Sequence, residues 1–530
     1  MSDQTRPSFT YQPSLRPALP SVYGPQEYRD QVAEYQNMDA CLQAGLEHTF
    51  ILKLAADSGL DWANATDKAQ NQFAKRASLC LRCNLAKSLT GFSFRELAIH
   101  ATDSTLLNWF ISGNNFGVNI VPSKSNFQRL ADLASADILA ELNIELILLA
   151  STPATLDSAA GAIVQPFDLE EGISLANIYF DGTCLKSNIH FPVDWVLLRD
   201  AIRTLMKATT LIRNAGLRSR MPQAPEDFMS DINHLCMAMS QSRRRKDAKK
   251  IRKALLRKMK KLVNIVAAHA QAHLDLLTAS RAETNLTEAQ ANVICKRLKN
   301  VLTQLPTALK QAHDRIIGER VVPNEDKIFS FYEPAVNCLV RGKANAETEF
   351  GNKLWLGETE QGLIIEWKLL QDNQDDSQLV LPSIKELKSK LPPSTIKSAT
   401  GDRGTQSAAN DAGLAEQGII SHLCPRDPDA MAARQAEDPA FRKAQKRRGA
   451  TEGRIAIIKN VFLGGLVRSK GHTHREQSVG WAVLTHNLVV ISDLLKTQRA
   501  KAERAEREAK AKAGAKAKAL AKAPRQEQVA

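Results

Sequence analysis

The strand-like segment ANIYFDGTC, residues 176–184, stands far from the other strand-like segments of this 530-residue chain. A helical block follows it from about Val193 to Ile317, and β character returns only at Lys327–Val340. Two further runs, EFGNKLWLGE and GLIIEWKLL, flank the turn-like TEQG and predict a hairpin. This order of elements predicts a mixed α/β protein.

The rest of the C-terminal half alternates between helix and strand patterns. SIKELKSKL predicts a helix, STIKSATGD predicts a strand that ends at Asp402, and IISHLC (419–424) predicts another strand. A helix is expected through Glu452 to about Phe462, and a final helix over about Gln477–Gln498. The Ala/Lys-rich residues beyond it, 496–530, are of low complexity, and we expect them to be helix-prone and projecting.

The N-terminal part predicts a small all-α domain. We interpret residues 1–70 as an arm and leader, of which the first 25 are mobile, and helical periodicity runs from about Asn71 to Leu149. Ser93 with Glu96 predicts a capping box, and Ser123 or Ser125 could cap a later helix. Such a domain could recognise DNA ends, or it could serve packing or dimerisation, and the sequence does not separate the two.

Composition excludes some classes of protein. The chain is 43% hydrophobic, and its most apolar stretch, Val479 to Ile491, is interrupted by Thr485, His486 and Asn487. No stretch therefore reaches the roughly 18 uncharged residues of a membrane span. No secretory signal pattern is visible at the start, so we expect a cytoplasmic protein that associates with the bacterial nucleoid when bound to DNA.

Two close pairs of potential metal ligands are interpreted as structural. Cys80 and Cys83 lie in an apolar helical pattern with no second pair at zinc-site spacing, so buried reduced thiols are expected. His269 and His273 could share a helix face, but no third ligand marks a metal site there.

Positive charge is concentrated in two segments. Residues 243–261 hold twelve Lys/Arg and one Asp, and residues 496–530 hold eleven Lys/Arg and four Glu. Such segments attract polyanions, most often nucleic acid, although a solvated helix face or tail has the same composition. The predicted DNA-binding residues in the first segment are Arg243, Arg244, Arg245, Lys249, Lys250, Arg252 and Lys253.

Three acidic residues occupy positions suited to metal-ion chemistry. Asp181 lies in the first predicted strand, Asp402 ends a later one, and Glu452 lies on a helix. Carboxylates from two strands and a helix can converge on two divalent cations, which suit phosphodiester displacement. Oxygen ligands favour Mg²⁺ or Mn²⁺, so two such ions are the expected cofactors.

The helix around Glu452 adds cations to this set. Arg448, Glu452 and Lys459 fall on one helix face within about 40° at 100° per residue. That stripe suits a phosphate backbone crossing an active site, whereas the simpler interpretation is an exposed i,i+4 Arg–Glu pair.

The ordered set of motifs resembles a known family. IYFDGTCLKSNIHFP, ATGDRGTQSAAND and the R-x3-E-x6-K of the Glu452 helix, in this order, resemble the acidic motifs of DDE-type bacterial insertion-sequence transposases. KIFSFYEPAVNCLVRGKANAETEFGNK, GWAVLTHNLVVI and LAKSLTGFSFRELAIHATDSTLLNWF extend the resemblance over most of residues 71–495. Two positions depart from the pattern: Gln445 replaces a Tyr, and Thr405 replaces an aromatic residue after DRG.

The resemblance implies a fold and a set of roles. An RNase H-like catalytic core would span 166–200 plus 325–495, after a helical DNA-recognition domain over 71–165. The basic helical block, 201–324, would be an insertion that binds DNA or forms a dimer. Asp181 would bridge both metals, Asp402 and Glu452 would complete one site each, and Arg448 and Lys459 would contact DNA phosphates.

The expected activity is therefore DNA transposition. Cleavage at the ends of an insertion sequence would be followed by attack of the freed 3′-hydroxyls on target double-stranded DNA, in a homodimer or larger synaptic assembly. The alternatives are a degenerate transposase-derived protein that only binds DNA, and a metal-dependent nuclease. An aspartyl-nucleophile phosphatase, suggested by FDGT, would need an acid where Tyr179 stands.

Overall fold

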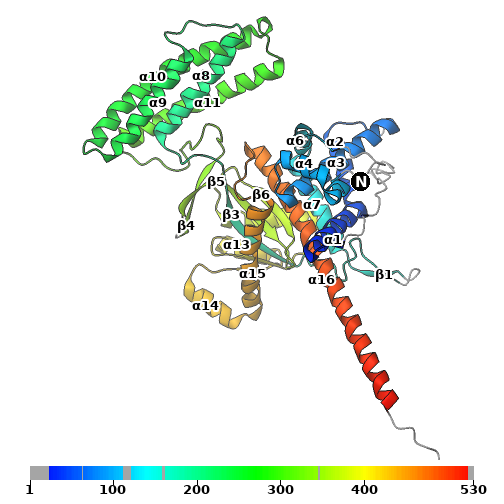
Figure 1. Cartoon of the computed structure of the whole chain (residues 1–530). Coiled ribbons are helices and arrows are strands. Elements are labelled where there is room, and N and C mark those ends of the chain that lie inside the picture. The colour runs from blue at the N-terminus through cyan, green and yellow to red at the C-terminus, as the bar shows by residue number, and fades with distance from the viewer. Residues whose placement is uncertain are drawn as a thin grey trace, which may run out of the picture.

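The protein is a mixed α/β structure in which helices flank one open mixed sheet. The computed structural model describes residues 19, 23–62, 64–111, 121–157, 162–343 and 346–522. Three parts are visible in Figure 1: a group of N-terminal helices, the sheet with its own helices, and a detached-looking helical bundle. The mobile arm is expected over the first 25 residues, and most of these lie outside the residues that the structure describes.

The sheet combines antiparallel and parallel pairing. Its strands are β3 (Asn177–Lys186), β4 (Asn337–Lys343), β5 (Ala346–Glu358), β6 (Ile364–Leu369), β7 (Ser398–Gly401) and β8 (Ile420–Leu423). The order is β4-β5-β3-β7-β8, and β6 also pairs with β5, beyond the stretch that pairs with β4. β5 is antiparallel to β3, while β7 and β8 continue parallel to β3.

Short helices connect the later strands and cover the sheet. They are η4 (Asp376–Gln378), α12 (Val380–Lys390), α13 (Ala408–Glu416), α14 (Pro428–Glu437), α15 (Pro439–Ile457) and η5 (Ile458–Phe462), the last a π-helical turn. The predicted hairpin, the helix over SIKELKSKL and the two later strands are confirmed, although Lys327–Val336 is not a strand. Strand β7 ends at Gly401, one residue before Asp402.

The N-terminal helices share one hydrophobic core with the sheet. They are α1 (Gln26–Cys41), η1 (Leu42–Leu46), α2 (Glu47–Asp57), α3 (Asp67–Thr90), α4 (Phe94–Asp103), α5 (Thr105–Ile111), α6 (Lys124–Ala131) and α7 (Ala136–Ser151). A small hairpin, β1 (Thr155–Asp157) with β2 (Ala162–Val164), follows them. The capping box of Ser93 with Glu96 is confirmed, and Ser123 caps α6.

The interpretation of residues 1–70 as arm and leader is wrong for α1 and α2. Tyr35, Met38 and Phe50 are buried in the common core. The two acids Asp39 and Glu47 are also buried, and both pair with Arg82 of α3, at 2.6 and 2.8 Å. Ion pairs with a residue distant in sequence allow this polar segment to be buried in the core. The composition of the segment alone does not predict such burial.

The helical block forms an up-and-down bundle with its own core. Its elements are α8 (Asp194–Asn214), α9 (Pro225–Gln241), η2 (Ser242–Arg244), α10 (Ala248–Ala279), η3 (Arg281–Glu283) and α11 (Glu288–Ile316). The bundle lies beside the sheet rather than over it (Figure 1). Leu198, Val263 and Leu298 are among the residues that fill its separate apolar core.

Both segments that connect the bundle to the sheet are held against β5. Phe191, just before α8, and Phe329, after α11, each pack against Phe350, with ring centroids 5.6 and 5.5 Å away from it. Two residues later, Phe331 is buried in the bundle core. Glu333 then forms a buried ion pair of 2.6 Å with Arg475. The bundle is therefore fixed to the sheet by contacts as well as by chain connection.

The last helix, α16 (His472–Lys522), is longer than predicted. It packs against the N-terminal helices α1, α3 and α7 and against strand β6 of the sheet. Its first half is buried, and Asn487 bonds both the N–H and the C=O of Ile364 on strand β6, each at 2.8 Å. These bonds explain why polar residues interrupt the apolar pattern of this helix. The Ala/Lys-rich second half projects away from the body, as expected (Figure 1). No proline interrupts the sequence between the halves, so the helix continues.

The first part of α16 passes a length and hydropathy test for a membrane span. Within the described residues it is the single such stretch, and 72% of its apolar window is buried inside the protein. Burial of this extent is what the central helix of a soluble protein shows.

Candidate active site

Asp181 is a buried acid in the middle of the sheet. It lies in β3, where residues 178–185 are all buried, and is itself 9% exposed. Tyr179, Asp181 and Thr183 share one face of the strand because side chains alternate, while Phe180 points to the other face and stacks on Trp355. Its carboxylate accepts a hydrogen bond of 2.7 Å from the N–H of Gly182.

Asp402 lies beside Asp181 at the end of the neighbouring strand. Tyr179 is in register with Thr400 across the parallel pair β3–β7, and continuing that register by two residues brings Asp402 level with Asp181. A tight turn fixes the Asp402 carboxylate, which accepts from the N–H groups of Gly404 and Thr405 at 2.8 and 3.2 Å.

The two acids interact electrostatically. The pKa of Asp181 is raised to about 7, first because burial disfavours the charged carboxylate and then because the charge of Asp402 is near. Arg448 and the Gly182 N–H act in the opposite direction. A carboxyl with a pKa this high in a partly open site is a frequent mark of function.

Asp376 is a third acid near this pair, and the sequence analysis did not identify it. Its carboxylate lies against Gly182, where a Cβ would come within 2.8 Å of Oδ1, and near Gly404. Its charge also raises the pKa of Asp181. Lys353 of β5 holds it in an ion pair of 2.9 Å. It sits in a turn between predicted elements, so no local pattern marked it.

Helix α15 lies on the Asp181 face of β3. Arg447 stacks over the Tyr179 ring at 4.7 Å, and Lys459 donates to Thr183 Oγ1 at 3.3 Å. Because Tyr179 and Thr183 flank Asp181 on the same face, the stretch of helix between these two cations passes over Asp181.

A buried carboxylate, Glu358 at the end of β5, holds α15 in that position. Glu358 is 2% exposed and bonds Arg447, Thr451 and Arg454, at 2.7, 2.7 and 2.9 Å. Three contacts to one buried acid bring three successive turns of the helix onto the sheet. Sequence reasoning missed Glu358 because it lies in a strand and resembles an ordinary strand-end polar residue.

Glu452 faces outward rather than toward the two Asp residues. Its side chain is 68% exposed and lies 3.5 Å from Arg448. Arg448 is more buried, with 22% of its side chain exposed, and its charge reaches Asp181. The prediction that Arg448, Glu452 and Lys459 share one helix face assumed 100° per residue. Lys459 lies in the π-helical turn η5, where the angle per residue is smaller, so its direction relative to the other two differs from the predicted one.

Gln445, which replaces the Tyr of the family pattern, ties α15 to the strand ends. Its Nε2 donates to the carbonyls of Gly401 and His422, at 3.1 and 2.6 Å. Its Oε1 accepts from Arg448 Nε at 3.3 Å. Thr405, the other departure, is fully buried and donates to the Asp402 carbonyl at 2.7 Å.

Within the described ranges, no three His, Cys, Asp or Glu side chains form a ready-made group around a metal position. Two acids, Asp181 and Asp402, are close, and the third predicted ligand, Glu452, is turned to solvent. The predicted two-metal site is therefore brought together in part.

The predicted DNA-binding residues of the basic segment lie on the bundle. They occupy η2, the turn after it and the start of α10. Arg245 pairs with Asp247, while Lys249 and Lys253 both pair with Glu319. The side chains of Arg243, Arg244 and Lys250 are exposed.

The close pairs of Cys and of His residues lie in helices α3 and α10. Cys80 and Cys83 are buried free thiols in α3. His273 is fully buried, its Nδ1 bonds the carbonyl of His269 at 2.7 Å, and its Nε2 accepts from the Ser219 N–H at 3.3 Å. Both ring nitrogens are thus engaged, which leaves neither for a metal.

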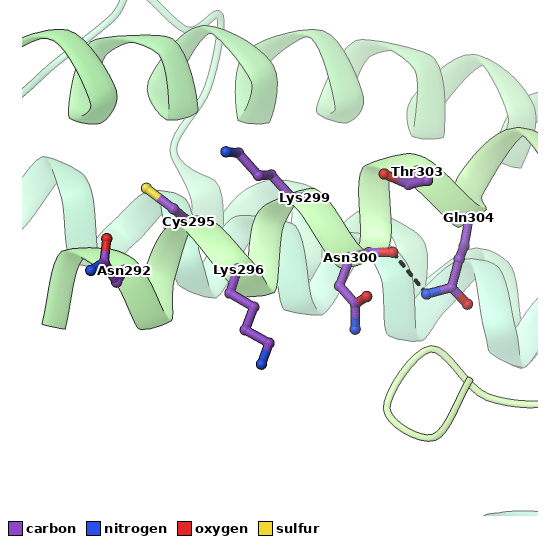
Figure 2. A pocket seen from close by; sticks show the side chains of 7 residues that line it. All are labelled: Asn292, Cys295, Lys296, Lys299, Asn300, Thr303 and Gln304. Carbon is purple, nitrogen blue, oxygen red and sulfur yellow. Dashed lines mark hydrogen bonds between the residues drawn. The ribbon is translucent and has the colours of Figure 1, made fainter. Parts of the chain in front are cut away.

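A shallow depression on the bundle has no part in this chemistry. It runs along one helix, α11, and contains no acid or histidine (Figure 2). Its lining residues are Asn292, Cys295, Lys296, Lys299, Asn300, Thr303 and Gln304.

Comparisons with protein-family models, with curated proteins and with solved structures produced no match to this chain. Its function must therefore be argued from the site itself.

Proposed function

We propose that this protein is a DDE-type DNA transposase, which cleaves the ends of an insertion sequence and joins them to target DNA. The observation that carries the proposal is the meeting of Asp181 and Asp402 under helix α15. Two acids side by side on adjacent parallel strands, with a cation-bearing helix crossing them, suit a phosphodiester held next to metal ions.

The topology supports an RNase H-like catalytic core. The first acid lies on the first strand of the sheet, β3, and the second directly follows the parallel neighbour β7. Strands β5 and β6 form the antiparallel side. The family resemblance implies a first acid on the first strand and a second at the end of the fourth. Here β7 is the fifth strand of the sheet in chain order, because β4 precedes β5, and the bundle is inserted between β3 and β4.

The residues fit divalent cations in donor type and in charge. Asp181, Asp402 and Glu452 supply carboxylate oxygens, which Mg²⁺ and Mn²⁺ prefer. The raised pKa of Asp181 means that its charged form lacks compensation, which a cation would provide. Glu452 is exposed and held by one contact of 3.5 Å, so its side chain is free to change rotamer. Two such ions would activate the attacking oxygen and stabilise the leaving oxygen.

The protein's own side chains position the DNA. Arg448 of α15 and Lys459 of η5 both lie near Asp181, and their charges suit consecutive phosphates of one strand. Lys459 would exchange its Thr183 contact for phosphate. Gln445 and Glu358 act as positioning residues, because they hold the Asp402 turn and α15 without reaching the reacting atoms.

Other parts of the chain would serve recognition and assembly. The N-terminal helices are the proposed readers of the element ends, and a homodimer or larger assembly would bring two ends together. The protein would act in the bacterial cytoplasm, on the nucleoid.

One observation favours a second candidate, a transposase-derived protein that binds DNA without cutting it. Glu452 contacts Arg448 and not the Asp pair, which is the arrangement of an ordinary surface i,i+4 ion pair. This candidate predicts DNA binding that no divalent cation converts to cleavage.

The test uses purified full-length protein, Mg²⁺ or Mn²⁺, and DNA carrying the sequences that flank the gene. Wild type is compared with Asp402→Asn and Glu452→Gln, and with Asp429→Asn as a matched control, since Asp429 is exposed on α14. Nicking at the ends, strand-transfer products and binding are measured separately.

The outcomes distinguish the candidates. Metal-dependent cleavage with joined products, lost in both site variants and retained in the control, supports the transposase. Cleavage without joined products indicates a nuclease. Binding without cleavage by the wild type indicates the DNA-binding candidate, and absence of binding would overturn both.

A further inference from the structure

The basic residues of the insertion lie at the end of the bundle where the chain enters and leaves it. Trp195, the second residue of α8, bonds Ser240 near the end of α9 at 3.3 Å and stacks under Arg252 of α10 at 5.3 Å. Glu319, just after α11, pairs with Lys249 and Lys253 of α10. The start of α8, the end of α9, the start of α10 and the end of α11 therefore meet at one end, which we call the basic end.

Most of the positive charge at the basic end has no acidic partner. Asp247 and Glu319 together pair with three cations. Among the residues that the structure describes, several exposed cations there form no ion pair with a carboxylate. They are Arg243, Arg244, Lys246, Lys250, Arg257, Lys258 and Lys261. Closely spaced exposed cations repel one another, so a polyanion that neutralises them binds favourably.

Chain connection limits how far the start of α8, one of the elements that form the basic end, lies from the active site. Asp194, the first residue of α8, is thirteen residues beyond Asp181. A fully extended chain of that length spans at most about 45 Å. Trp195 ties the basic end directly to this start of α8. At about 3.4 Å per base pair, 45 Å corresponds to about 13 base pairs of duplex.

The bundle is also held in place, so this limit describes a fixed surface and not a loose arm. Three consecutive residues join the two parts: Phe331 is buried in the bundle core, Tyr332 OH bonds Thr204 of α8 at 3.1 Å, and Glu333 pairs with Arg475. Arg475 also bonds Asn352 of β5 at 3.0 Å.

We propose that the basic end binds the phosphate backbone of double-stranded DNA within about 13 base pairs of the phosphate in the active site. The position relative to the cut rests on the proposed function, whereas the contact with DNA does not. Contacts with phosphates carry no sequence information, so the proposed contribution of the basic end is independent of sequence. It extends the DNA surface of α15 onto the insertion and fixes the course of one duplex arm.

The test compares two variants that remove equal charge from the two ends of the bundle. The basic-end variant is Arg243→Gln, Arg244→Gln, Lys250→Gln and Arg257→Gln. The control is Arg281→Gln, Lys296→Gln, Arg297→Gln and Lys299→Gln, from η3 and α11 at the opposite end (Figure 2 shows Lys296 and Lys299). All eight side chains are exposed. Binding to a random-sequence duplex is measured between 50 and 200 mM salt, with far-UV circular dichroism to verify folding.

Loss of about four phosphate contacts lowers the slope of log K against log salt by about 3 to 4 in the basic-end variant, and by less than about 1 in the control. Equal slopes for wild type and the folded basic-end variant would overturn the proposal. So would a shift in oligomeric state by light scattering with unchanged DNA binding, which would make this end a dimer surface.

Hydroxyl-radical footprinting on the gene-flanking DNA then tests the position. Protection that lies within about 13 base pairs of the cut and disappears in the basic-end variant supports the proposal. Protection confined to greater distances contradicts it. If the wild type cuts no DNA, the proposed function fails while the salt slope still decides whether the basic end contacts DNA.

Discussion

Gln445 donates a hydrogen bond of 3.1 Å to the backbone carbonyl of Gly401, the residue directly before Asp402. The same amide nitrogen donates to the His422 carbonyl, and Arg448 donates to the amide oxygen. One side chain therefore connects the ends of two parallel strands to a cation of α15. The departure from the family pattern at this position has a structural role in this chain.

Replacing Gln445 with Ala should impair cleavage more than binding. Loss of three hydrogen bonds should lower stability by about 1.5 to 4.5 kcal/mol. Loosening the Asp402 turn should lower the rate of metal-dependent DNA cleavage at least about tenfold, because small misplacements of catalytic groups are costly. Gln435→Ala, on neighbouring α14, is the control. Equal cleavage rates for both variants would show that Gln445 does not position the site.

Glu358→Ala should destabilise the protein and abolish activity together. It removes the buried acid that binds Arg447, Thr451 and Arg454, and so leaves two half-buried guanidinium groups without their partner. Breaking a buried ion pair in this way costs about 3 to 5 kcal/mol. Urea denaturation measures this cost, and Glu416→Ala, an exposed acid on α13, should change it by less than about 0.5 kcal/mol. A loss of unfolding free energy in Glu358→Ala as small as in the control would mean that contacts other than those of Glu358 fix α15 on the sheet.

Asp181→Asn should stabilise the metal-free protein at alkaline pH. The folded pKa of about 7 lies above the unfolded value of about 3.9, so the folded state binds more protons between these values. Stability therefore falls as pH rises from about 4 to 7, and the full cost persists above 7. An Asn side chain carries no charge and therefore avoids the free-energy cost of ionising a buried carboxyl.

The measurement is the free energy of unfolding in EDTA at pH 5 and pH 8. The gain of Asp181→Asn over wild type should be about 2 to 4 kcal/mol at pH 8 and smaller at pH 5, since one pKa unit is about 1.4 kcal/mol. Asp429→Asn should show no such pH dependence. A gain that is equal at both pH values would mean that the Asp181 carboxyl is not protonated near neutrality.

Arg82→Met should be strongly destabilising although it replaces a charge with an apolar side chain. Arg82 is 1% exposed and neutralises both Asp39 and Glu47, so its removal leaves two buried carboxylates without this cation. We expect a loss of about 3 to 5 kcal/mol in thermal or urea unfolding. Lys53→Met breaks the exposed pair with Glu141 and should cost no more than about 1 kcal/mol. Similar losses of unfolding free energy in the two variants would show that burial of the Arg82 ion pairs does not determine the cost of breaking them.

Much of the secondary structure follows from local sequence. The buried strand around Asp181, the helical block and the capping box of Ser93 are recognisable because side-chain periodicity and capping depend on residues a few positions apart. The placement of Asp402 just after a strand could be predicted in the same way. The charge of the segment 243–261 is likewise a property of the sequence alone.

Only the tertiary structure determined which polar residues contact one another across long sequence distances. Glu358 and Asp376 acquire their positions from contacts with α15 and with Lys353, and neither has a local signature. The acids of α1 and α2 enter the core only because Arg82 lies opposite them. Burial and the pairing of charges distant in sequence are properties of the packed chain, and they set the pKa of Asp181 and the outward position of Glu452.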